Sequence, residues 1–145
     1  MARVRDLDLI AVSVGARLVL GVFAGAVASF LGWITAFWAF KLVDFTPVTF
    51  PVVTVLAIGL WVALAVSLSW WHMDSPRRAG LVNSLVITLV SLVSSYIGFR
   101  AGLENSGFTW VERGIVFPMA NASVLGANVV AMALHLYRVV VRREV

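Results

Sequence analysis

The sequence predicts an all-α integral membrane protein, a compact bundle of four transmembrane helices with both termini on the inner side (N-in/C-in). Three observations predict this class. The 145 residues are 61% hydrophobic and only 12% charged, whereas soluble domains carry about 25% charged residues. Four long apolar stretches divide the chain, and basic residues gather on one side of them. The whole chain, residues 1–145, is expected to form a single transmembrane domain.

The first predicted span covers residues 10–40 and is interrupted only by Arg17. About 20 apolar residues are enough to cross a bilayer, and the part after Arg17 is already that long. We expect the Arg17 side chain to reach the inner headgroups. Small residues recur at spacings of three and four, which predicts close helix packing within the chain, or between two copies of it. These residues are Gly21, Gly25, Ser29 and Gly32.

The second and third predicted spans cover residues 52–71 and 81–99. Trp70 and Trp71 close the second span and are expected to anchor it at the inner interface. The third span carries a seam of hydroxyl groups, each of which can donate to the carbonyl four residues earlier. The seam is therefore explained by packing, and a hydrated path for a solute is the alternative. It consists of Ser84, Thr88, Ser91 and Ser95.

The fourth predicted span covers residues 115–141 and carries a polar stripe. Asn121, Asn128 and His135 are seven residues apart, so they share one side of a helix. Amide and imidazole groups are costly against lipid, so we expect the stripe to face the bundle interior or another subunit. Hydrogen bonds between helices explain it, and a substrate or ion path is the alternative. The segment before this span, residues 100–114, alternates apolar and polar residues and is expected to lie in the outer interface.

The orientation follows from the basic residues. If the helices alternate, eight Lys and Arg residues fall on one side and three on the other, and the basic side is retained inside. We expect a basic inner face that attracts anionic lipid headgroups. An acidic internal partner is the alternative, and five arginines are few for nucleic acid. The face consists of Arg77, Arg78, Arg138, Arg142 and Arg143.

Catalytic chemistry is not predicted. The chain has no cysteine, and its carboxylates all lie at helix ends or in loops, which removes the usual proton relay or sodium site of a coupled transporter. We therefore predict no enzymatic activity, no metal site and no cofactor. One alternative is a haem held by His72 and His135, which lie at similar depths.

These observations predict a non-catalytic, multi-pass protein of the cell membrane that serves as a structural or accessory subunit of a membrane assembly. It is expected to form an oligomer with copies of itself or with other membrane subunits. A small oligomeric channel or transporter that uses the stripe of Asn121, Asn128 and His135 is one alternative. The other is a small envelope protein of a membrane-containing virus, whose inner face contacts the genome.

Overall fold

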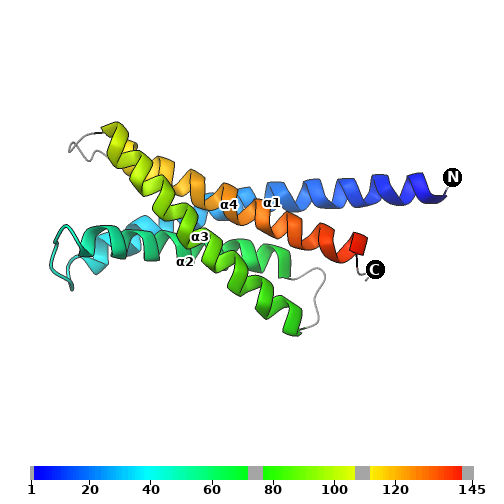
Figure 1. Cartoon of the computed structure of the whole chain (residues 1–145), viewed down its shortest axis with the longest axis horizontal. Coiled ribbons are helices and arrows are strands. Elements are labelled where there is room, and N and C mark those ends of the chain that lie inside the picture. Colours follow the sequence, from blue (N-terminus) through cyan, green and yellow to red (C-terminus); the bar gives the residue numbers. More distant parts are fainter. Residues whose placement is uncertain (1, 72–76, 107–111, 142–145) are drawn as a thin grey trace.

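Four long helices make up most of the molecule (Figure 1). The structure is a computed structural model of the whole chain, and it describes residues 2–71, 77–106 and 112–141. The prediction of an all-α bundle with four long apolar helices is confirmed, and its orientation in a membrane stays a prediction. In chain order the helices are α1 (Ala2–Ala39), α2 (Thr49–Trp71), α3 (Arg77–Ser106) and α4 (Glu112–Val141).

Consecutive helices run antiparallel, so both chain termini lie at one end of the bundle (Figure 1). We call this the terminal end, and the opposite end, which holds residues 40–48, the distal end. Each helix packs against its neighbours in the chain, and α1 also packs against α4. In addition α2 touches α4 across the centre, whereas α1 and α3 make no contact within the described residues. The core therefore lies between α2 and α4.

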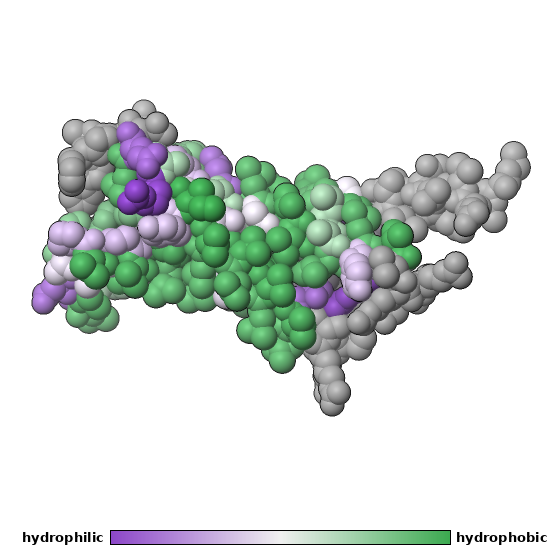
Figure 2. Space-filling view, viewed as in Figure 1, coloured by the Kyte–Doolittle hydropathy of each residue, from purple (hydrophilic) through white to green (hydrophobic). Residues whose placement is uncertain are grey.

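All four helices are long and apolar enough to cross a membrane. In Figure 2 hydrophobic residues cover the middle of the molecule, and hydrophilic residues lie towards both ends, with more of them visible at the distal end. Such a surface is typical of a bundle whose sides face hydrocarbon. The apolar parts of the helices are Ser13–Ala39, Thr49–Trp70, Gly80–Glu104 and Ile115–Arg138.

The third helix is longer than predicted. It continues to Ser106, so residues 100–106 extend the helix, and the position of residues 100–114 in the outer interface stays a prediction. Arg100 and Glu104 lie 3.9 Å apart at a spacing of four residues, which a helix brings together. Leu103 packs against the buried core, and both contacts favour continuing the helix. Residues 107–111 lie outside the described residues.

The start of α2 is fixed by two threonines. The Thr49 backbone N–H donates to Thr46 Oγ1 at 3.1 Å, and the Thr46 N–H donates to Thr49 Oγ1 at 2.9 Å. This reciprocal pair satisfies backbone donors that a helix start leaves without partners. Pro51 follows within the first turn, where its missing N–H costs little.

The core is built from branched and small side chains of the two central helices. Ile58, Val62 and Val66 of α2 and Met119 and Ala127 of α4 each have 0% of their surface exposed. Their periodicity of three to four residues places them on one side of each helix. These buried side chains hold α2 and α4 in contact, and the polar groups described next lie on the same two helices.

Candidate functional site

A polar cluster lies where α1, α2 and α4 meet, in the half of the bundle nearer the terminal end. We call Arg17, Gly21, Trp70, Asn128 and His135 the polar junction. Asn128 is 3% exposed and Trp70 is 8% exposed, while Arg17 and His135 are half-buried. Antiparallel packing of α1 and α4 places Gly21 against Asn128 and Arg17 against His135.

Arg17 contacts a histidine of the facing helix α4. Its Nη1 lies 3.1 Å from Nδ1 of His135. Because a guanidinium group can only donate, the imidazole nitrogen accepts in this bond and carries no proton there. The expectation that Arg17 reaches the inner headgroups stays a prediction. An arginine within an apolar helix lies in the bundle interior when a partner is available.

Trp70 also differs from its predicted role. Its indole ring is buried, and its centre lies 5.6 Å from the centre of the His135 ring. It therefore packs inside the bundle and is not an interface anchor. Its sequence position at the end of an apolar stretch, beside Trp71, gave the signal of an anchor. Because α2 is apolar on all sides, the sequence does not indicate that the side carrying Trp70 faces α4.

The Asn128 amide has one half bonded and one half without a partner. Its Nδ2 donates to the Val124 carbonyl at 2.9 Å. Its Oδ1 is buried and, like Trp70 Nε1, has no hydrogen-bond partner among the described residues. Both atoms lie beside the place where Gly21 would carry a Cβ. The bond to Val124 fixes the amide orientation, because a reversed amide would bring two oxygens together.

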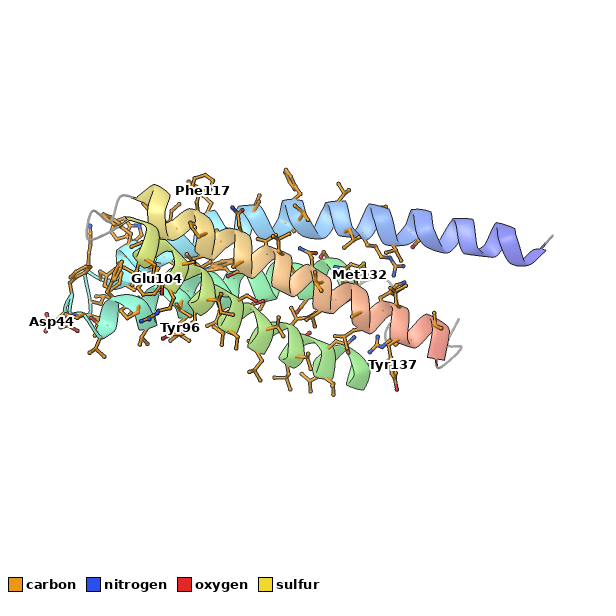
Figure 3. The ribbon with its side chains drawn as sticks, turned by 45° about the horizontal axis from the view of Figure 1, so that its top comes forward. Asp44, Tyr96, Glu104, Phe117, Met132 and Tyr137 are labelled. Carbon is orange, nitrogen blue, oxygen red and sulfur yellow. The ribbon has the colours of Figure 1, made fainter. Side chains whose placement is uncertain are left out.

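The third member of the predicted stripe lies elsewhere. Asn121 is exposed on the side of α4, in a groove of about 450 Å³ between α1 and α4. Phe117, one turn before it, is 65% exposed and points away from the bundle (Figure 3). In a single chain the stripe is thus divided, with Asn128 inside and Asn121 outside. We call this surface the α1–α4 groove, and its lining includes Val22, Ala26, Phe30, Phe117, Ala120 and Asn121.

The small residues of α1 contact two different helices. All four are buried. A Cβ on Gly25 would lie 3.0 Å from Val124 of α4, and one on Gly32 would lie 2.6 Å from the Ile58 Cα of α2. Ser29 donates to the Gly25 carbonyl at 2.9 Å. The helix therefore passes from α4 to α2 along its length, and the α1–α4 groove opens where it leaves α4.

The hydroxyl seam of α3 has three kinds of environment. Ser84 and Thr88 donate to the carbonyls four residues earlier, at 2.9 and 2.7 Å. Ser95 instead pairs with Ser123 of α4, and both are fully buried. Ser91 is also fully buried, and its hydroxyl has no partner among the described residues. The seam thus mixes backbone bonding with contact between helices.

Three further glycines lie at close contacts. Gly98 approaches the α4 backbone so closely that a Cβ would lie 2.5 Å from the Pro118 carbonyl oxygen. A Cβ on Gly59 would collide with the Leu92 side chain, and a Cβ on Gly126 would collide with the Ser94 side chain. Gly59 and Gly126 were missed in the sequence, although Ala63 and Ala122 lie four residues from them and complete pairs of small residues that are typical of helix contacts.

Three of the five arginines of the basic inner face lie within the described residues. Arg77 and Arg78 begin α3, and Arg138 lies near the end of α4, so these three positions share the terminal end. Arg142, Arg143 and His72 lie outside the described residues. The haem alternative therefore rests on one described residue, His135, whose Nδ1 accepts from Arg17.

A second pocket lies at the distal end, with a volume of about 430 Å³. Aromatic residues make up half of its lining, and the ring centres of Phe45 and Phe50 are 5.1 Å apart. Lys41 stands at the pocket, with its ammonium group 4.0 Å from the centre of the Trp38 ring. This distance is typical of a cation–π contact.

Known families, curated proteins and solved structures give no match to this chain. Its function is therefore argued from its own geometry. Within residues 2–71, 77–106 and 112–141, no group of three His, Cys, Asp or Glu side chains lies close enough to hold a metal ion. The polar junction and the α1–α4 groove are the two candidate sites.

Proposed function

We propose that this protein is a multi-pass membrane protein that acts without catalysis as a structural or accessory subunit of a larger membrane assembly. The observation that carries the proposal is the exposed amide of Asn121 within the apolar part of α4. A polar side chain that faces hydrocarbon is costly, and contact with another helix relieves this cost.

The shape of the α1–α4 groove supports the same proposal. Its lining is mostly apolar and contains the small residues Ala26 and Ala120, which allow a helix backbone to approach closely. The amide of Asn121 then offers a hydrogen bond to the incoming helix. We therefore propose that a helix of a neighbouring subunit, either a second copy or another protein, packs here.

The alternative of a channel or transporter has less support. It requires Asn121, Asn128 and His135 on one path, whereas the single chain turns Asn121 outwards and Asn128 inwards. The wholly buried side chains of Ile58, Val62 and Met119 fill the centre. A path along the whole stripe would thus have to form between subunits.

The absence of native cysteine makes a clean cross-linking test. Ala120→Cys places one thiol in the α1–α4 groove, and Leu89→Cys places one on the side of α3, where Leu89 is 65% exposed. In the native membrane we expect a short thiol cross-linker to trap Ala120→Cys in a defined adduct, while Leu89→Cys stays monomeric. An adduct of twice the mass indicates a second copy, and any other defined mass indicates a different subunit.

Native mass spectrometry of the unmodified chain, released from its source membrane, provides an independent check. The proposal expects a stoichiometric oligomer or complex. A single chain by mass, together with an Ala120→Cys variant that forms no adduct, would overturn it.

A further inference from the structure

The polar junction contains two buried atoms of opposite hydrogen-bonding character. Trp70 Nε1 carries a proton and can only donate, whereas Asn128 Oδ1 can only accept. The two residues are 8% and 3% exposed. Neither atom has a hydrogen-bond partner among the described residues. Buried polar groups of folded proteins nearly always have partners, so both atoms require one.

Both atoms lie beside the same position of α1. The position that a Cβ of Gly21 would take lies 3.2 Å from Trp70 Nε1 and in direct contact with Asn128 Oδ1. Any side chain larger than hydrogen at position 21 would displace the amide. The glycine thus allows the amide oxygen of α4 to lie directly against α1, next to the indole N–H of α2.

The two atoms favour a guest that both accepts and donates a hydrogen bond. The bond from Asn128 Nδ2 to the Val124 carbonyl holds Oδ1 towards Gly21 and the Trp70 N–H. That oxygen repels an anion, and the Trp70 N–H repels a cation. A molecule that accepts one hydrogen bond and donates another satisfies both atoms. Water is the smallest such molecule, and buried water commonly joins polar groups that cannot reach each other.

We infer that Trp70 and Asn128 bind one water molecule beside Gly21, which accepts from the indole N–H and donates to the amide oxygen. This water joins α2 to α4 at the point where α1 crosses them. The site lies inside one chain, so the inference is independent of the proposed assembly through the α1–α4 groove.

The test is a nuclear magnetic resonance experiment on the full chain in lipid nanodiscs, with ¹⁵N-labelled tryptophan. The chain has six tryptophans, and the Trp70→Phe variant assigns the Trp70 indole resonance by its disappearance. Rotating-frame spectra give opposite signs for cross-relaxation with bound water and for proton exchange. We expect a cross-relaxation peak between the Trp70 indole proton and water.

Three variants locate the site. We expect the water peak to be lost in Asn128→Leu, which removes the acceptor, and in Gly21→Ala, whose Cβ would displace the acceptor oxygen. The matched control is Asn121→Leu, which changes the exposed asparagine of the same helix and should keep the peak. Unchanged positions of the other five indole resonances show that a variant is folded.

Two results would overturn the inference. One is a wild-type spectrum without the water peak, in which the indole proton instead contacts the Asn128 side chain directly. The other is a folded Asn128→Leu variant that keeps the peak. If neither interior variant folds, the wild-type spectrum decides by itself.

Discussion

At the scale of single residues, Arg17, the one arginine within the first apolar stretch, pairs with His135 of the facing helix. The two residues are 118 positions apart in the chain, yet Nη1 and Nδ1 lie 3.1 Å from each other. An arginine near a helix end is normally expected to reach the headgroups. Here a neutral imidazole on the facing helix offers an acceptor inside the bundle, and the guanidinium group donates to it.

This contact predicts a measurable coupling. In a double-mutant cycle of Arg17→Gln and His135→Leu, unfolding in mixed detergent micelles should give a coupling energy of about 0.6 kcal/mol, with an upper range of about 1.7 kcal/mol. Each single change already removes the bond between the two side chains, so the double variant loses less stability than the sum of the two single losses.

The matched control is a cycle of Lys41→Gln and His135→Leu, because Lys41 belongs to the pocket at the distal end. Distant residues add within about 0.3–0.5 kcal/mol, so this cycle should show no coupling beyond that range. Equal values in the two cycles would contradict the contact.

At the scale of helices, glycines decide how closely the elements approach. The backbones of α3 and α4 meet at Gly98 and Pro118, and those of α1 and α2 meet at Gly32 and Ile58. Between apolar helices in a membrane, such close packing replaces the hydrophobic effect as the source of association. The glycines therefore matter because the lack of a side chain allows the neighbouring backbone to approach.

We predict that Gly98→Ala destabilises the bundle by at least about 1–3 kcal/mol, the usual cost of overpacking. A Cβ there would lie 2.5 Å from the Pro118 carbonyl oxygen and 2.7 Å from the Met119 nitrogen, and backbone atoms cannot yield as a side chain does. Thermal unfolding followed by tryptophan fluorescence measures the change.

The control for this prediction is Gly15→Ala. A Cβ on Gly15 meets no atom within 4 Å, and alanine favours a helix over glycine by about 0.5–1 kcal/mol. This variant should therefore be neutral or slightly more stable. Equal losses in the two variants would show that helix propensity, and not the contact with α4, determines the effect.

At the scale of the whole molecule, the antiparallel order of the helices gives the two ends different characters. Both termini lie at the terminal end (Figure 1), and Figure 3 places Asp44 at the tip of the distal end and Tyr137 near the terminal end. The formal net charge of the chain is +4, and among the described residues Arg77, Arg78 and Arg138 lie at positions near the terminal end. Basic residues are retained on the cytoplasmic side, which supports the proposed N-in/C-in orientation.

Thiol labelling in intact cells tests this orientation. Val48→Cys and Val140→Cys place single thiols at opposite ends, at positions that are 73% and 70% exposed. We expect a membrane-impermeant maleimide to label Val48→Cys in intact cells, and Val140→Cys only after permeabilisation. Full labelling of both in detergent is the control for reactivity, and the reverse pattern in intact cells would overturn the orientation.

The sequence by itself determined the four apolar helices, because each exceeds the length that a bilayer requires. It also located the small residues and the polar stripe by their spacing. It did not pair Arg17 with His135 or place Trp70 inside, since hydropathy carries no information about which side of a helix meets which neighbour.

Only the tertiary structure decided which polar residues are covered. Residues seven apart drift by about 20° around a straight helix, so Asn121 and Asn128 look almost equivalent in the sequence. The path of α1 separates them, because it packs against α4 at Gly25 and against α2 at Gly32. Asn128 is covered by α1 where the helices touch, and Asn121 is left in the groove where they part. The direction in which one helix crosses another is set by side-chain packing along both, which no single stretch of sequence contains.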